Sequence, residues 1–270
     1  MKKVFVAVTV AGLGTILLSI SAHAGALAFD AAGNLFLAGD GHSISKYVPD
    51  GTKSTFAAGL SPLRLSFDGK GNLFVSTGEA IDPKDSILKF TPDGKRSTFA
   101  TGISPEGMAF DRSGNLFVSQ GDSIFKFTPK GVKSTFVISK PSFYFTDLAF
   151  DAAGNLFVTD EHSIHKFAPD GTESTFATGL DHPTGLAVDA ASSVYVTVVT
   201  APDAGSHAIL KFGPDGTKST FASLLGSFFA GDLAFDRSGN LFVWNSHAIL
   251  KFDPSGAPTT FASDWVSPDK

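Results

Sequence analysis

The chain repeats one segment of about 40 residues six times, and this repetition limits the possible folds more than any other feature. Each copy opens with a short apolar segment that ends in Asp, at positions Asp30, Asp68, Asp111, Asp151, Asp189 and Asp236. A Gly-Asn pair follows in every copy except the fifth, which has Ser192-Ser193. Repeats of this length with several strand-like pieces are typical of β-propellers, in which one copy forms one blade.

Each copy contains four short segments rich in Phe, Val, Ile and Thr, which in the fourth copy read LAF, LFV, IHKF and STFA. Turn residues separate them: Asp151 can bind turn amides, Pro169 fixes its φ angle, and Gly171 can adopt a positive φ. Such runs between turn residues indicate β-strands. We therefore predict an all-β fold, a six-bladed β-propeller of four-stranded antiparallel blades over residues 25–263. A solenoid is the alternative, but turns this tight favour separate blades.

Only some of the connections between strands differ in length from copy to copy. Seven residues separate the opening Asp from the end of the second strand in all six copies, and ten separate a Lys of the third strand from a Phe of the fourth. The connections from second to third strand, and from one copy to the next, differ in length. Because antiparallel strands alternate in direction, all these variable connections lie on one face. Variable loops on a rigid scaffold are where binding residues concentrate.

The N-terminus has the pattern of a secretory signal. Lys2 and Lys3 precede an apolar run over 4–20, and Ala22-His23-Ala24 has small residues at the cleavage positions. We predict that 1–24 is a signal peptide, that 264–270 is a C-terminal tail, and that the protein is secreted or periplasmic. An uncleaved anchor is the alternative, although the apolar run is short for a membrane span. No stable membrane insertion is expected after cleavage.

Composition excludes several classes of protein. The net charge is −5, whereas nucleic-acid binding requires basic patches. The chain has no Cys, so stability in an oxidising compartment must come from packing. It also lacks a serine nucleophile elbow, a phosphate-binding loop and a paired-histidine metal helix.

Three carboxylates enter the innermost strands beside one arginine. Glu106, Asp147 and Asp232 immediately precede or begin the first strand of their copies, as does Arg64. First strands converge on the propeller axis, so these side chains are expected near one another. Clustered oxygens suit Ca²⁺ or Mg²⁺. The alternative is that Asp147 and Asp232 bind backbone amides where their strands begin.

Histidines recur at one position of the repeat: His42, His162, His207 and His247. Each belongs to a different blade, away from the axis, so we interpret them as polar groups that hold a turn. His182 lies instead on a connection between copies, and it is the candidate acid or base. The repeated lysines of the third strand are expected to cover apolar surface with their stems.

Some connections carry aromatic residues that the standard repeat lacks, and Trp244 replaces Ser or Thr at the end of a second strand. Aromatic rings beside carboxylates would suit a sugar-like or other small ligand. The alternative is that some of these rings plug the channel or pack between blades. Together with Arg64, the substrate-binding candidates are Phe143, Tyr144, Phe228, Phe229 and Trp244.

The segment PTGLAVD…SSVYV…ILKFGPDG over 183–216 resembles an NHL repeat, and residues 25–263 resemble the six-bladed NHL and gluconolactonase-like propellers. The resemblance implies a divalent cation at the channel mouth, with Glu106 of the PEGM segment as a ligand. Asp147 and Asp232 lie one position after the matching slots, and the His/Glu site of the related streptogramin lyases has no match here. Two functions follow as hypotheses: a module that binds a small molecule or peptide, and a metal-dependent hydrolase of lactones or esters.

Overall fold

The computed structural model describes residues 4–8, 16–20, 26–39, 42–78, 85–138, 144–201, 206–224, 231–245 and 248–263. Strands β1 (Val4–Val8) and β2 (Ile16–Ile20) form a separate antiparallel pair, and the remaining strands form six blades. Blade 1 comprises β3 (Ala26–Phe29), β4 (Leu35–Ala38), β5 (Ser43–Tyr47) and β6 (Lys53–Ala58). Blade 2 comprises β7 (Pro62–Phe67), β8 (Leu73–Thr77), β9 (Ser86–Phe90) and β10 (Arg96–Thr101). Blade 3 comprises β11 (Gly107–Phe110), β12 (Leu116–Gln120), β13 (Ser123–Phe127) and β14 (Lys133–Ile138).

Blade 4 comprises β15 (Leu148–Phe150), β16 (Leu156–Thr159), β17 (Ser163–Phe167) and β18 (Glu173–Thr178). Blade 5 comprises β19 (Leu186–Val188), β20 (Val194–Ala201), β21 (Ser206–Phe212) and β22 (Lys218–Leu224). Blade 6 comprises β23 (Leu233–Phe235), β24 (Leu241–Trp244), β25 (Ala248–Phe252) and β26 (Pro258–Ser263). The four strands of each blade are named a to d in chain order.

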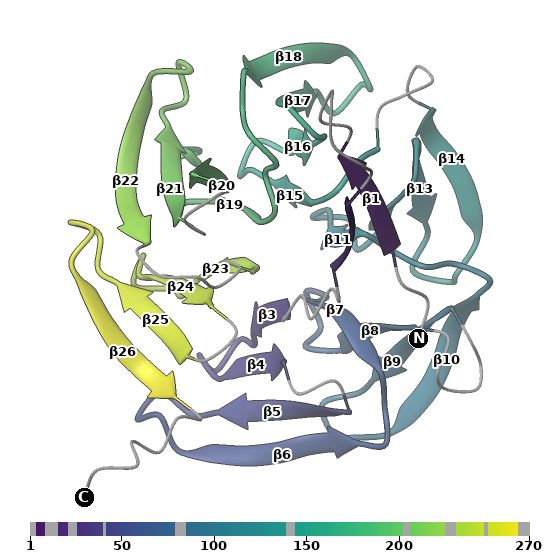
Figure 1. Cartoon of the computed structure of the whole chain (residues 1–270). Coiled ribbons are helices and arrows are strands. Elements are labelled where there is room, and N and C mark those ends of the chain that lie inside the picture. Colours follow the sequence, from purple (N-terminus) through teal and green to yellow (C-terminus); the bar gives the residue numbers. More distant parts are fainter. Residues whose placement is uncertain are drawn as a thin grey trace, which may run out of the picture.

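Each blade is an antiparallel sheet of four consecutive strands. The a strands surround the centre of the ring and the d strands form its outer edge (Figure 1). The predicted six-bladed propeller is thus confirmed. The antiparallel order also places every b–c and d–a connection at the same end of its blade, and we refer to that end of the disc as the loop face.

The turn between strands a and b explains the repeated Asp and Gly-Asn. In blade 4 the Oδ1 atom of Asp151 accepts hydrogen bonds from the amides of Ala153 and Asn155, and Oδ2 accepts from Nδ2 of Asn155 at 2.7 Å. Gly154 adopts a φ of 86°, which is costly for a residue with a side chain. In blade 5 the Gly is replaced by Ser192, which still has a positive φ of 64°.

Phenylalanines interlock neighbouring blades. Phe36 of strand b lies edge-on to Phe56 of its own strand d and to Phe67 in strand a of the next blade, both at centroid distances of 5.0 Å. The strand c lysine lies over the same ring, as with Lys46 above Phe36 at 5.5 Å. Equivalent Lys–ring contacts occur in all six blades. The lysines are therefore structural, and they add a cation–π contact to the expected covering of apolar surface.

The ring closes by packing blade 6 against blade 1. Leu27, Leu37 and Tyr47 of blade 1 share one core with Phe242 and Trp244 of blade 6. Among the described strands none is exchanged between these two blades, because each blade is built from four consecutive strands. The tail 264–270 lies outside the described residues.

The segment predicted to be a signal peptide contributes only the short β1–β2 pair to the described structure. Cleavage after Ala24 remains a prediction. Among the described residues, no helix has the length and apolar character needed to cross a membrane.

Candidate functional site

The residue at the start of strand a is alternately small and charged in successive blades around the axis. Blades 1, 3 and 5 have Ala26, Gly107 and Gly185 there, whereas blades 2, 4 and 6 have the charged residues Arg64, Asp147 and Asp232. Since the a strands surround the centre of the ring, the three charged side chains come from alternate blades around a single axis (Figure 1).

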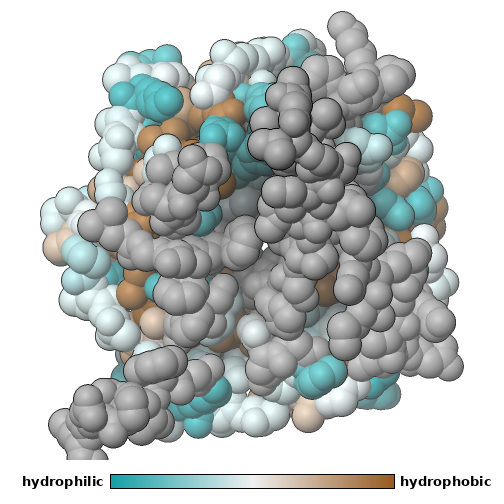
Figure 2. Space-filling view, in the orientation of Figure 1, coloured by the Kyte–Doolittle hydropathy of each residue, from teal (hydrophilic) through white to brown (hydrophobic). Residues whose placement is uncertain are grey.

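These three charged residues border a cavity of about 220 Å³ at the axis. All six a strands or their entry residues contribute to its lining, including Leu27, Met108 and Leu186. We refer to this space as the axial cavity. The space-filling view shows hydrophilic and apolar residues interspersed around the described rim of the molecule (Figure 2).

Each aspartate ties its own blade to the next one. Oδ1 of Asp147 accepts the amide of Leu148 at 2.8 Å, and Oδ2 accepts the amide of Leu186 in blade 5 at 2.9 Å. Asp232 repeats this arrangement, with Oδ1 bound to the amide of Leu233 at 2.9 Å and Oδ2 bound to the amide of Leu27 in blade 1 at 3.1 Å. The interpretation that these aspartates bind amides where strands begin is therefore confirmed. In addition, one hydrogen bond of each aspartate connects its own blade to the next blade.

The small residues in between have a steric cause. A Cβ atom on Gly107 would lie 2.9 Å from both Cα and Oδ1 of Asp147. A Cβ atom on Gly185 would lie 2.6 Å from the carbonyl oxygen of Gly231, next to Asp232. A charged residue can therefore enter one blade only where the preceding blade leaves space for it.

Arg64 follows the same pattern in blade 2. Its Nε atom donates to the carbonyl oxygen of Glu106 in blade 3, and Nη1 donates to the carbonyl oxygen of Leu63 at 3.2 Å. The Glu106 carboxylate itself is exposed. The polar contact that Glu106 makes at the axis is thus made by its main chain.

Two carboxylates and one guanidinium leave an excess of negative charge at the axis. Burial raises the pKa of Asp147, and the positive charge of Arg64 opposes this change. Burial and the charge of Asp147 raise the pKa of Asp232 to about 7, again against Arg64 and the two amides. Asp147 is buried, whereas Asp232 is partly open towards the cavity. A proton, or a ligand that carries positive charge, would relieve this excess.

We predict that the protein loses stability as the pH rises from about 4 to about 7, because over this range the folded protein holds a proton on Asp232 that the unfolded chain has already released. A carboxyl group whose pKa is raised in the folded state, as for Asp232, favours folding below the unfolded value of 3.8, and this contribution disappears as the pH rises through about 7. Thermal unfolding across this range measures the effect. Asp232→Asn should flatten the profile, and an unchanged slope in that variant would contradict the assignment to Asp232.

The axial residues do not form a ready site for a divalent cation. Among the described residues, no group of three His, Asp or Glu side chains is arranged to hold a metal ion. The oxygens of Asp147 and Asp232 are directed at amides, and the Glu106 side chain is exposed. The donor set expected from the resemblance to gluconolactonase-like enzymes is therefore not gathered at the axis.

The structure places His182, Trp244 and Tyr144 away from the axial cavity. The His182 side chain is 57% exposed and bonds to Asp181, and it does not line the cavity. Trp244 is 5% exposed and packs in the core between blades 6 and 1, so it offers almost no surface to a ligand. Tyr144 is 68% exposed. Phe143, Phe228 and Phe229 lie outside the described residues.

Hydroxyl groups at the end of strand b support the axial residues, and the sequence reasoning did not identify them. Oγ1 of Thr159 accepts the amide of Asp147 at 3.0 Å, and Oγ1 of Thr197 accepts the amide of Gly185 at 2.8 Å. The available signal was the Ser or Thr that follows the first three residues of strand b in blades 2 to 5.

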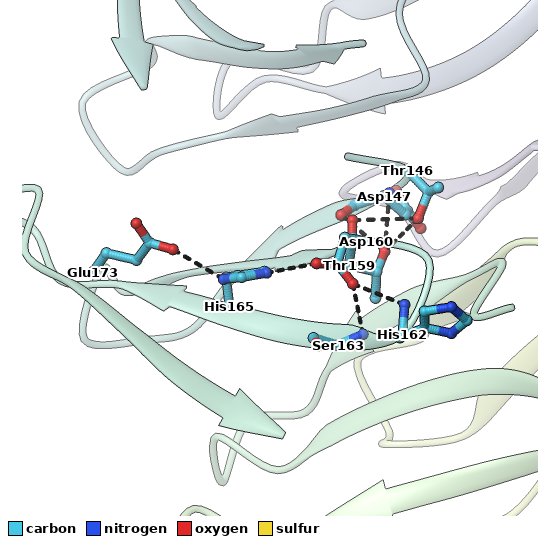
Figure 3. A network of polar contacts seen from close by, with 8 residues as sticks. All are labelled: Thr146, Asp147, Thr159, Asp160, His162, Ser163, His165 and Glu173. Atoms are coloured by element: carbon cyan, nitrogen blue, oxygen red, sulfur yellow. Dashed lines mark hydrogen bonds and ion pairs between the residues drawn. The ribbon is translucent and has the colours of Figure 1, made fainter. Parts of the chain in front are cut away.

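A second polar network in blade 4 was also not predicted (Figure 3). Fully buried Asp160 accepts the amides of His162 at 2.8 Å and Ser163 at 2.6 Å through Oδ1. Its Oδ2 atom lies 2.8 Å from Nε2 of His165, whose Nδ1 lies 3.0 Å from Glu173. This network fixes the b–c turn of blade 4, which holds His162.

No protein-family model matches the sequence, and no curated protein matches it. Solved structures do match. Virginiamycin B lyase from Staphylococcus aureus has 13% identity over 92% of this chain and 87% of its own, with a TM-score of 0.66. A gluconolactonase from Xanthomonas campestris has 22% identity over 74% of each chain, with a TM-score of 0.62. An auxiliary nutrient binding protein from Bacteroides ovatus has 13% identity over 88% of this chain and 69% of its own, with a TM-score of 0.67.

These similarities confirm the resemblance to gluconolactonase-like propellers at the level of the fold. The matched proteins include a lyase, a gluconolactonase and a nutrient-binding protein. One fold therefore serves different activities, and the function of this chain depends on its own site residues.

Proposed function

We propose that this protein is an exported binding module that holds a small molecule in the axial cavity, near the loop face. The observation that supports this proposal most strongly is the set of charges around the cavity. Arg64, Asp147 and Asp232 line one concave space to which all six blades contribute. A cavity with a few convergent polar groups and perturbed carboxyl pKa values is the usual form of a ligand site.

The size and charge of the cavity restrict its ligand. A volume of about 220 Å³ is smaller than the roughly 300–1,000 Å³ of drug-sized pockets, which favours a small molecule over a peptide. The excess negative charge favours a ligand with an amine, a guanidine or several hydrogen-bond donors. A peptide would instead have to bind over the exposed rim, for example at Tyr144.

Two features support export. Residues 1–24 have the order of regions found in a secretory signal. One matched structure is the extracellular domain of a putative one-component system from Bacteroides thetaiotaomicron, with 11% identity over 90% of this chain and a TM-score of 0.59. N-terminal sequencing of protein collected outside the cytoplasm should give Gly25 as the first residue, and an intact Met1 there would contradict the cleavage.

The binding proposal can be tested with fragments of opposite charge. We would screen primary amines, guanidines, neutral sugars and small carboxylates by ligand-observed NMR against the wild type and the Arg64→Met and Asp232→Asn variants. Amines and guanidines should bind the wild type, bind Arg64→Met more tightly, and bind Asp232→Asn more weakly. If no fragment binds the wild type, or if both variants leave the affinities unchanged, the axial cavity is not the binding site.

The hydrolase hypothesis makes a different prediction. It requires a divalent cation near Glu106, Asp147 and Asp232. The carboxylate oxygens of both aspartates, however, already accept hydrogen bonds from backbone amides. We expect that Ca²⁺, Mg²⁺ and EDTA leave the thermal midpoint unchanged, and that Glu106→Gln behaves as the wild type. A midpoint that rises with Ca²⁺ or Mg²⁺ and loses this response in Glu106→Gln would restore the metal-dependent enzyme as the better account.

A further inference from the structure

Two histidine rings from different connections meet in blade 4, apart from the axial cavity. His162 belongs to the b–c turn and His182 to the connection that leads from blade 4 to blade 5. Their ring centroids lie 6.0 Å apart, with the ring planes at 80°. Neither residue borders the axial cavity. We refer to them as the histidine pair.

Backbone hydrogen bonds hold the two connections together. The amide of Leu180 donates to the carbonyl oxygen of His162 at 2.9 Å, and the amide of Val199 in blade 5 donates to the carbonyl oxygen of Asp181 at 3.0 Å. Fully buried Asp160 fixes the b–c turn through the amides of His162 and Ser163, as Figure 3 shows. The histidine pair is therefore carried by positioned backbone on both sides.

Both rings use the same nitrogen, Nδ1, as a hydrogen-bond donor. Nδ1 of His162 lies 3.2 Å from the carbonyl oxygen of Leu180, and Nδ1 of His182 lies 2.6 Å from Oδ1 of Asp181. A carbonyl or carboxylate oxygen can only accept, so each Nδ1 carries the hydrogen. In the neutral imidazole each Nε2 then has a free lone pair. Histidines that bind metals commonly use this arrangement, in which a carbonyl or carboxylate orients the ring.

The charges around the pair favour a cation. Oε1 of Glu161 lies 3.7 Å from Nε2 of His182, and Asp181 adds a second carboxylate. The side chains of His182, Asp181 and Glu161 are about half exposed, at 57%, 49% and 60%, so small rotations are available to them.

We propose that the histidine pair binds a transition-metal ion such as Zn²⁺ or Cu²⁺ through the two Nε2 atoms, with Glu161 or water completing the coordination. Two imidazoles on one ion place their ring centres about 5–6 Å apart, because Zn–N bonds are about 2.0–2.1 Å long. Imidazole ligands select these ions over Ca²⁺ and Mg²⁺. No third ligand is already in position among the described residues, so two imidazoles define the site.

The proposal can be tested by calorimetric titration of Zn²⁺ into the metal-free full-length protein. One equivalent should bind, and His182→Asn should weaken the affinity by about tenfold or more. Asparagine suits this exchange because His182 has a φ of 45°, a conformation that Asn tolerates. Asp181→Asn should cause a smaller loss, since it removes only the carboxylate that orients the ring.

His42→Asn is the matched control, because His42 occupies the same repeat position in blade 1, and it should leave the affinity unchanged. With Cu²⁺, electron paramagnetic resonance should report two nitrogen ligands in the wild type and one in His182→Asn. Equal Zn²⁺ affinity in the wild type and His182→Asn, or an absence of binding by the wild type, would overturn the proposal. The axial-cavity proposal would be unaffected, because the two sites share no residue.

Discussion

Replacing Asp147 by alanine should lower the free energy of unfolding by about 2–5 kcal/mol, because it leaves two buried amides without an acceptor. One of these amides belongs to Leu148 in the same blade and the other to Leu186 in the next blade. Asp147 is only 8% exposed, so water cannot easily replace the lost carboxylate. Chemical denaturation monitored by fluorescence measures the change.

Asp122→Ala is the matched control for this substitution. Asp122 is exposed, and its carboxylate accepts a hydrogen bond from the hydroxyl of neighbouring Ser123. Its loss should change the stability by about 0.5 kcal/mol or less. If the two variants were equally stable, the carboxylate of Asp147 would not hold blades 4 and 5 together.

Replacing Gly185 by alanine should destabilise the protein by about 1–3 kcal/mol, because the added methyl group has no space at the axis. Its Cβ would lie 2.6 Å from the carbonyl oxygen of Gly231, a backbone atom that can move only if strand a of blade 6 moves. We also expect a change in the environment of Asp232, the residue that follows Gly231. The shift is measured by denaturation, and the change at the axis by the chemical shift of the Asp232 carboxyl carbon.

Gly69→Ala provides the comparison, because a Cβ there would meet no atom within 4 Å. Gly69 has no positive φ, so alanine also brings no backbone strain. That variant should be as stable as the wild type or slightly more stable. A Gly185→Ala protein that matches Gly69→Ala in stability would show that the alternation of small and charged residues is not required by packing.

The repeat was sufficient to predict the fold because it controls local structure in every copy. Asp151 and Gly154 build their turn from residues within the same copy, so the pattern can be recognised without neighbouring blades. Phe36 illustrates the next level, since it contacts one ring in its own blade and one in the next. When all copies are similar, a contact between neighbours is also repeated.

The candidate site was predicted only in part, because it depends on differences between the copies. The sequence predicted that Arg64, Asp147 and Asp232 lie near the axis, and the structure places all three around one cavity. It also grouped Glu106 with them, although Glu106 precedes the axial position by one residue. In a strand, neighbouring residues point to opposite sides. The Glu106 side chain is exposed, whereas a Cβ atom on the next residue, Gly107, would lie 2.9 Å from Asp147.

Trp244 shows a second limit of reading one copy at a time. A tryptophan in place of Ser or Thr suggested a ligand contact at the end of strand b. Blade 1 follows blade 6 in space but not in sequence, and Trp244 packs into the core that these two blades share. The alternative stated from the sequence, that some of these rings pack between blades, therefore holds for Trp244.

The central claim is that the axial cavity carries unbalanced negative charge that a cationic ligand can neutralise. Carbon-13 NMR of the aspartate carboxyl groups, titrated with pH in the absence and presence of guanidinium or a simple amine, tests this most directly. The Asp232 carboxyl should titrate with a pKa of about 7 in the free protein, and at a lower pH when the cation is present. A pKa of Asp232 near the ordinary value of 3.8, unchanged when the cation is added, would contradict the claim.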